Sequence, residues 1–249
     1  MKLGKNQLSY QVNSNIVKDI KKVTTIFFDI DGTLTNHKGA QNIAVECIRK
    51  KYFPHISSER FLNNWIKFTN IFWLLYVKGK INFNDQRVNR VKAIWKLFGK
   101  SINKKDSEMI VNEYVLDYES NIDSFPYVIS TLEYLYNKNY RLGIISNGSN
   151  SQQIKKLKKI NVYGSFEEKL IFISEKIGYA KPDARIFHHA QKISGTNSNQ
   201  IAFFGDDIKN DILPANNLHW QAMLIDYTNA LSHYNLPRII SFKEIMNKY

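Results

Sequence analysis

The chain of 249 residues is 43% hydrophobic, which is enough for one large domain, or for a core with a smaller second domain, and argues against disorder. Its single cysteine, Cys47, excludes an internal disulfide framework and fits a reducing compartment. The formal charge of +13 at pH 7 is compatible with an anionic partner such as nucleic acid.

The distribution of the basic residues argues against a nucleic-acid site. Four lysines fall between apolar residues at helical spacing within residues 154–160, namely Lys155, Lys156, Lys158 and Lys159. We interpret them as the solvated face of an amphipathic helix, as most charge runs are. No apolar stretch has the length of a membrane span, and the N-terminus lacks the apolar segment of a signal peptide. We therefore expect a cytoplasmic protein, a monomer or homodimer, with no nucleic-acid or membrane partner.

Residues 1–22 are polar and rich in Asn and Lys, so we interpret them as an N-terminal extension. The following apolar run, residues 23–28, predicts a short buried strand. Two carboxylates one residue apart, Asp29 and Asp31, come directly after it and precede Gly32 and Thr33. A buried carboxylate is costly unless a cation or hydrogen bonds compensate it, so this strand end is a candidate metal or phosphate site. A strand that simply runs into an acidic turn is the alternative.

Helical periodicity replaces the strand pattern over about residues 36–123. A helix is expected over residues 42–51, and three apolar stripes follow it, formed by Phe61, Trp65, Phe68, Phe72 and Leu75, by Val88, Val91, Trp95 and Phe98, and by Ile110, Tyr114 and Tyr118. This run is too long for a simple crossover between two strands and predicts an inserted helical bundle. Most of its aromatic residues are expected in the core of the bundle, with Trp73 and Tyr76 as candidates to face a cleft.

Strands and helices alternate in the rest of the chain. Strands are predicted over residues 142–145, 170–173, 201–204 and, as the last core strand, 222–225, and helices over residues 127–137 and 152–160. A further helix is predicted to open at Lys181-Pro182-Asp183, because proline suits a first helical turn, and its buried stripe would be Ile186, Phe187, Ala190 and Ile193. The alternation indicates a Rossmann-like α/β fold in which a doubly wound parallel sheet is covered on both faces.

Polar residues follow three of these predicted strands: Asp29, Ser146 and Asp206. The carboxyl ends of parallel strands lie along one edge of a sheet, where ligands bind, so these residues are expected to be neighbours.

The order of these motifs resembles that of the haloacid dehalogenase-like hydrolases. Asp29-Ile30-Asp31-Gly32-Thr33 matches the first motif of that family, Ser146 ends a later strand, Lys181 follows, and Gly205-Asp206-Asp207 with Asn210-Asp211 matches the final acidic motif. The similarity covers about residues 23–227. It implies an α/β core made of residues 23–36 and 124–249, and a helical cap domain, residues 37–123, that closes over the active site. The sequence of residues 174–187 looks like that of the capped branch of the family, which contains pyrimidine 5′-nucleotidases and sugar-phosphate phosphatases.

The resemblance also implies a Mg²⁺ site and a role for each motif residue. The Asp29 carboxylate, the Asp31 backbone carbonyl and the Asp206 carboxylate would bind the metal, and Asp207 or Asp211 would join or orient its ligand shell. Asp29 would be the nucleophile, and Asp31 the general acid and then the general base. The substrate phosphate would be bound by Gly32, Thr33, Ser146, Asn147 through its backbone amide, and Lys181.

The expected function is therefore that of a Mg²⁺-dependent phosphatase of small phosphomonoesters, with a nucleoside 5′-monophosphate as the leading candidate. An acid at position 31 favours phosphoryl chemistry over dehalogenation in the resembled family. The alternatives are a sugar-phosphate phosphatase, a phosphomutase of the same fold, and a non-catalytic protein that binds a phosphorylated ligand or a partner.

Overall fold

The computed structural model describes residues 23–249, so the predicted N-terminal extension lies outside the described residues. Within them, six parallel strands form one sheet in the order β3-β2-β1-β4-β5-β6. The strands are β1 (Thr25–Phe28), β2 (Arg141–Ser146), β3 (Ile171–Ile173), β4 (Ile201–Gly205), β5 (Gln221–Ile225) and β6 (Arg238–Ile239). The chain builds outward from β1 to β3 and then returns to the other side of β1. This reversal makes the sheet doubly wound, as the sequence predicts.

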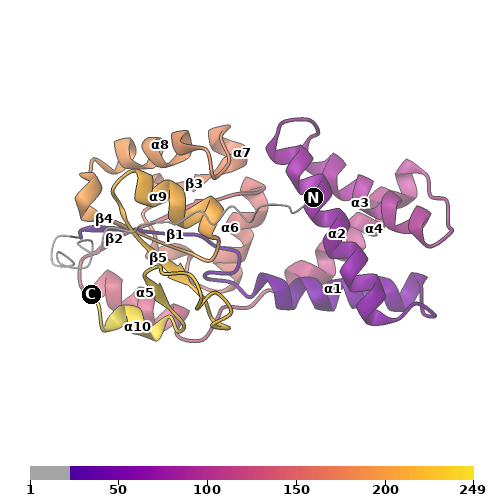
Figure 1. Cartoon of the computed structure of the whole chain (residues 1–249), viewed down its shortest axis with the longest axis horizontal. Helices are drawn as coiled ribbons and strands as arrows, with labels where there is room; N and C mark the ends of the chain where they lie inside the picture. Colours follow the sequence, from indigo (N-terminus) through magenta and orange to yellow (C-terminus); the bar gives the residue numbers. More distant parts are fainter. Residues whose placement is uncertain (1–22) are drawn as a thin grey trace, which may run out of the picture.

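Helices cover both faces of the sheet because its strands are apolar on both faces. Consecutive residues of β1 point in opposite directions, so that Phe27 stacks on Trp220 at 5.6 Å while Phe28 stacks on Phe204 at 5.4 Å, measured between ring centroids. The helices of this part are α5 (Val128–Asn137), α6 (Asn150–Lys159), α7 (Ser174–Ile177), α8 (Ala184–Ser194), α9 (Leu213–Asn217) and α10 (Lys243–Met246). Residues of α8 and α9 pack on one face and residues of α5 and α10 on the other (Figure 1).

Three details differ from the sequence predictions. The last strand is β6, not residues 222–225; it has only two residues, too short to give a periodic signal. Helix α8 begins at Ala184 with Asp183 as its N-cap, so Pro182 precedes the helix and does not occupy its first turn. Ile193, predicted on the buried stripe of that helix, is 43% exposed, since the buried face continues from Ala190 to Ser194 instead.

Four helices stand between β1 and α5 and form a bundle beside the sheet (Figure 1). They are α1 (His37–Tyr52), α2 (Ser58–Val77), α3 (Phe83–Leu97) and α4 (Lys104–Ser120). Helix α1 packs against α4 and α2 against α3, as the predicted inserted bundle requires. The aromatic stripe of α2 is fully buried only at Phe61 and Trp65. Within residues 23–249, none of the helices has the length and apolar character needed to cross a membrane.

Candidate active site

Three carboxylates meet at the carboxyl edge of the sheet. Asp29 follows β1, Asp206 follows β4, and Asp211 lies in the π-helical turn Ile208–Ile212. Each offers an oxygen atom within 4.8 Å of the others, and both Asp29 and Asp211 are buried. The sequence prediction that residues far apart would converge here agrees with this geometry for Asp29 and Asp206. Such a group of oxygen ligands could hold a hard divalent cation.

Lys181 is the cation inside this cluster. Its ammonium donates to Asp29 Oδ1 at 2.7 Å and to Asp211 Oδ1 at 2.6 Å, and the lysine is 3% exposed. Burial opposes its charge, but Asp211 and Asp29 outweigh burial and hold the pKa of Lys181 above its ordinary value. Burial, together with the charges of Asp29 and Asp211, raises the pKa of Asp206 well above its usual range. Three carboxylates around one ammonium therefore leave an excess of negative charge that a bound cation would neutralise.

Two glycines allow the carboxylates to approach the backbone so closely. A Cβ atom at Gly32 would lie 2.2 Å from Asp206 Oδ2, and the φ of +90° at Gly32 is one that other residues rarely adopt. A Cβ atom at Gly205 would lie 2.3 Å from Asp211 Oδ2. The glycines of both motifs therefore serve the packing of the acidic cluster.

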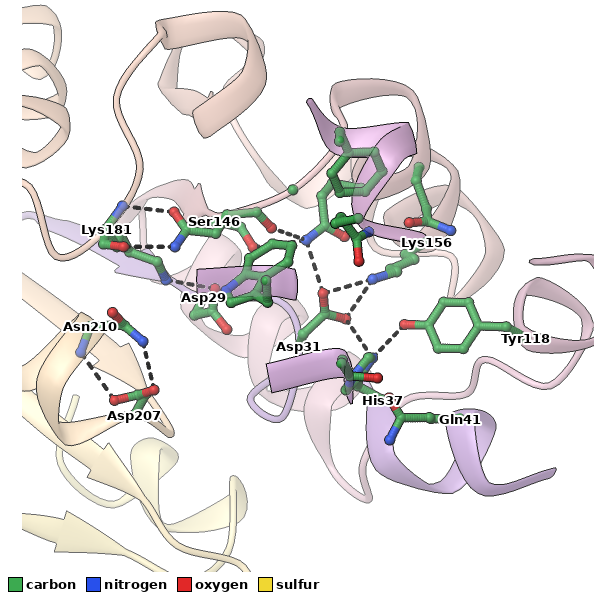
Figure 2. Close-up of a pocket in the computed structure, with 18 of the residues that line it drawn as sticks. Asp29, Asp31, His37, Gln41, Tyr118, Ser146, Lys156, Lys181, Asp207 and Asn210 are labelled. Carbon is green, nitrogen blue, oxygen red and sulfur yellow. Dashed lines mark hydrogen bonds and ion pairs between the residues drawn. The ribbon is translucent and has the colours of Figure 1, made fainter. Parts of the chain in front are cut away.

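Ser146, the last residue of β2, lies beside the cluster (Figure 2), and Asn147 follows it in the chain. The Asn147 side chain donates to the Lys181 carbonyl at 2.9 Å and accepts from the Lys181 N–H at 2.7 Å, which fixes the backbone of that lysine. The Ser146 hydroxyl, which is buried, accepts from Gln153 Nε2 at 3.0 Å. Both residues line the same pocket as the carboxylates.

The other predicted site residues lie less directly at the cluster. The Thr33 hydroxyl is buried and has no partner among residues 23–249, while its carbonyl accepts from the Tyr227 hydroxyl at 2.7 Å. The Asp207 carboxylate accepts from the backbone N–H groups of Lys209 and Asn210, so it caps the following turn although the residue lines the pocket. Of the two predicted shell residues, Asp211 is the one whose carboxylate joins Asp29 and Asp206.

Asp31 is held by a lysine that the sequence interpretation placed in solvent. Lys156 is 4% exposed and donates to both Asp31 oxygens at 2.6 and 2.7 Å, and Gln153 Nε2 donates to Asp31 Oδ2 at 3.0 Å (Figure 2). The prediction of a solvated lysine run is therefore wrong at this position, whereas Lys155, Lys158 and Lys159 are exposed. Burial opposes the ionisation of Asp31, but Lys156 and His37 outweigh it and hold the pKa of Asp31 well below its usual range.

The sequence does contain a signal for Gln153 and Lys156. Helix α6 starts directly after the turn at Ser146, so its first turns must lie at the carboxyl edge of the sheet. Residues three apart share one face of a helix, and this face also carries Leu157, which is buried. Gln153 and Lys156 therefore lie on a buried helix face next to Ser146 and Asn147, which indicates that their side chains have polar partners in the site.

Helix α1 contributes a second contact to Asp31. His37 Nδ1 lies 3.8 Å from Asp31 Oδ1 and 2.6 Å from the Tyr118 hydroxyl of α4. Burial lowers the pKa of His37, and the charge of Asp31 only partly offsets this. The first helix of the bundle thus meets the acidic motif directly, and the last helix reaches it through His37.

We expect Lys156→Met to lower the free energy of unfolding by about 1–3 kcal/mol, because a partly buried carboxylate loses its cation. Turnover should fall about 10- to 100-fold, because Asp31 loses the group that orients it. Lys155→Met is the matched control on the same helix, since Lys155 is 68% exposed and lies 3.5 Å from Glu119. It should change stability by no more than about 0.5 kcal/mol. Urea unfolding and steady-state kinetics of both variants check this, and equal effects would contradict a special role for Lys156.

The pocket above these residues has a volume of about 330 Å³ and lies between the sheet edge and the helical bundle. Its bundle side is formed by His37, Gln41, Thr69, Asn70, Trp73, Phe83, Gln86, Arg87, Arg90, Tyr114 and Tyr118. Of the two aromatic residues predicted as candidates for a cleft, Trp73 lines this pocket. Tyr76 instead packs beside Trp73, with ring centroids 5.2 Å apart.

The doubly wound sheet, the inserted helices and the acidic residues at the strand ends are together typical of one class of hydrolases with a parallel-sheet core. The family model described as haloacid dehalogenase-like hydrolase matches residues 26–225. The chain therefore belongs to the haloacid dehalogenase-like hydrolase family, which confirms the resemblance seen in the sequence.

Similarity to known proteins extends over different lengths. The chain is 36% identical over 102 residues to glyceraldehyde 3-phosphate phosphatase of Methanothermobacter thermautotrophicus, a match that covers 41% of this chain and 44% of that relative. It is 26% identical to the pyrimidine 5′-nucleotidase YjjG of Escherichia coli over 76% of this chain and 79% of that protein. The magnesium-bound crystal structure of the HAD-hydrolase YfnB from Bacillus subtilis has a TM-score of 0.75 at 18% identity, covering 91% of this chain and 98% of that one. This last likeness supports the fold.

Proposed function

We propose that the protein is a Mg²⁺-dependent phosphatase that hydrolyses small phosphomonoesters through a phosphoryl group held on Asp29. The observation that carries the proposal is the buried Asp29 carboxylate, which shares Lys181 with Asp211 and lies beside Asp206 at the edge of the sheet. A carboxylate in this place can attack a phosphorus atom if the charges of both are neutralised. The names of the two relatives, a phosphatase and a nucleotidase, agree with this class of reaction.

The acidic cluster fits a divalent metal ion. Asp29 and Asp206 would hold it with their carboxylates and Asp31 with its backbone carbonyl, and Asp211 would complete or orient the ligand shell. Oxygen ligands and an excess of negative charge favour Mg²⁺ over softer metals. When bound, the ion would offset the charge of the phosphoryl group and of the attacking carboxylate.

The residues of the chain divide the reaction into two displacements. In the first, an Asp29 oxygen forms a bond to phosphorus, the bond from phosphorus to the leaving oxygen of the substrate breaks, and this leaving oxygen takes the proton that Asp31 must carry into the step. In the second, water attacks phosphorus, Asp31 takes a proton from the water, and the bond from phosphorus to Asp29 breaks. Lys181 neutralises charge in both steps. The Lys156 contact stabilises the ionised form of Asp31, which is the product of the first step and the base of the second.

Substrate selection falls to the inserted helices, which we propose act as the cap domain of residues 37–123. A nucleoside 5′-monophosphate stays the leading expectation from the sequence, and the name of the first relative adds a triose phosphate. The pocket volume of about 330 Å³ favours small esters of either kind.

The proposal is tested by phosphate release from a panel of nucleotides, sugar phosphates and triose phosphates. We expect release in Mg²⁺, its loss after removal of the metal with EDTA, and its return when Mg²⁺ is added in excess. Equal rates with and without metal would contradict the metal-dependent mechanism. A folded protein that binds Mg²⁺ but releases phosphate from no ester, and that also fails to interconvert sugar phosphates, would contradict the enzyme assignment.

A further inference from the structure

The bundle side of the pocket contains two arginines on one face of α3. Arg87 and Arg90 are three residues apart, so their side chains are neighbours on the helix. Arg90 is 4% exposed, and Arg87 is half-buried. Both line the pocket, opposite the acidic edge of the sheet.

Within residues 23–249, neither guanidinium forms an ion pair with an acidic side chain. Among residues 23–249, no Asp or Glu oxygen lies within 4.0 Å of either one, in contrast to Lys156 and Lys181, which are both paired. Arg90 donates to the Thr69 hydroxyl at 3.0 Å, but its Nε group is buried and has no partner in this part of the chain. Arg87 donates to Gln152 Oε1 at 2.7 Å. Glu119 and Glu175 act on the half-buried Arg87 from beyond 4.0 Å. A buried charge without a counterion is costly, so the buried Arg90 guanidinium in particular favours an incoming anion.

The distribution of charge along the pocket gives the position of that anion. The acidic residues that line the pocket, Asp29, Asp31, Asp206, Asp207 and Asp211, belong to the sheet edge, and the lining residues of the four bundle helices include no Asp or Glu. Each arginine also lies against an aromatic side chain: Arg90 is 4.8 Å from the Trp65 ring and 5.0 Å from the Tyr114 ring, and Arg87 is 4.5 Å from the Phe83 ring. These rings hold the guanidinium in one orientation but supply no formal charge.

Burial, with a smaller contribution from the nearby charge of Arg87, lowers the pKa of Arg90 to about 10. The two cations therefore repel one another inside the pocket. An anion between them would relieve both the repulsion and the missing hydrogen bonds.

We propose that Arg87 and Arg90 form a second anion-binding subsite, so that the preferred substrates are phosphomonoesters whose leaving group carries a carboxylate or a second phosphate. This inference rests on the proposed phosphatase function and specifies its substrate class. A nucleoside 5′-monophosphate or a triose phosphate, the two candidates given above, has no second anion, so both should rank below doubly anionic esters as substrates. Substrates with a second acid group would be bound at both ends, with the scissile phosphate at the sheet edge and the other anion at α3.

Matched pairs of esters test the subsite. The first pair is 3-phosphoglycerate and glycerol 3-phosphate, which differ in a carboxylate against a neutral carbinol, and the second is fructose 1,6-bisphosphate and fructose 6-phosphate. We expect kcat/KM of the wild-type protein to be about 10- to 100-fold higher for the member of at least one pair that has the additional anion. The pair that shows the preference identifies a carboxylate or a phosphate as the favoured group.

Arg90→Met should remove most of that preference, mainly by raising KM for the doubly anionic ester, so that kcat/KM becomes similar for the two members of the pair. Arg60→Met is the matched control, because Arg60 is an exposed bundle arginine that lies 5.6 Å from the Phe98 ring, outside the pocket. It should leave the preference intact. Should Arg90→Met fail to fold, Arg87→Gln tests the same subsite at a half-buried position. An unchanged preference in a folded Arg90→Met or Arg87→Gln protein would assign the arginines a structural role and overturn the proposal.

Calorimetric binding of the same esters to Asp29→Asn separates this inference from the phosphatase function. Hydrolysis of both members of each pair at equal rates, with equal binding, would overturn the subsite and leave the phosphatase function standing. Tighter binding of the doubly anionic esters without hydrolysis of any ester by the wild type would support the subsite and overturn the phosphatase function.

Discussion

Asp29→Asn is expected to reduce phosphate release by about 10⁴-fold or more, because an amide nitrogen or oxygen cannot form the covalent bond to phosphorus that the carboxylate forms. The change conserves the size of a side chain that is 6% exposed, and the amide oxygen can still accept from Lys181, so the fold should be retained. Steady-state phosphate release in Mg²⁺ measures the loss. Mass spectrometry of the purified variant is needed alongside, since deamidation would regenerate Asp29.

Glu133→Gln is the control for Asp29→Asn, because it makes the same chemical change at an exposed position of α5. It should leave turnover within about twofold of the wild type. If Asp29→Asn, free of deamidated protein, kept activity within about tenfold of the wild type, Asp29 would not be the nucleophile.

Lys181→Met is expected to be harmful to both stability and turnover. The methionine leaves Asp29 and Asp211 buried without their shared cation, which should cost about 3–5 kcal/mol of the free energy of unfolding in EDTA. Mg²⁺ should restore part of this stability, because it neutralises the same carboxylates. Turnover should fall about 10²- to 10³-fold, because the ammonium that would neutralise negative charge on the phosphoryl oxygens is lost.

Lys192→Met, an exposed lysine on α8, gives the control for the loss of one positive charge. Urea unfolding of both variants, with Mg²⁺ and with EDTA, provides the comparison. A Lys181→Met protein as stable as Lys192→Met in EDTA would show that the carboxylates need no internal cation.

The central parts of the site could be predicted because they interrupt a simple pattern. Asp29 and Asp206 end apolar strands, and a parallel sheet brings such ends together whatever lies between them in the chain. The inserted bundle was predictable for the same kind of reason, since helical spacing over residues 36–123 excludes a short crossover.

Residues that break the usual relation between charge and exposure could not be predicted in the same way. Lys156 lies in a run of lysines that are otherwise exposed, and its only sequence signal is indirect: it shares a helix face with the buried Leu157 on a helix that follows β2. Arg90 interrupts the apolar stripe of α3 and is buried between aromatic rings of α2 and α4, a packing that periodicity alone does not reveal. Such side chains become informative only when their distance to neighbouring charges is known.

The most direct test of the account follows the fate of the phosphoryl group in Asp31→Asn. p-Nitrophenyl phosphate needs no general acid, because nitrophenolate is a good leaving group, so the first displacement should proceed while the second, which needs Asp31 as a base, stalls. Rapid mixing in Mg²⁺ should give a burst of about one equivalent of nitrophenolate per protein, and mass spectrometry after acid quench should find the phosphoryl group on the peptide that contains Asp29. Slow release without a burst, with no phosphoryl group on that peptide, would contradict a covalent mechanism through Asp29.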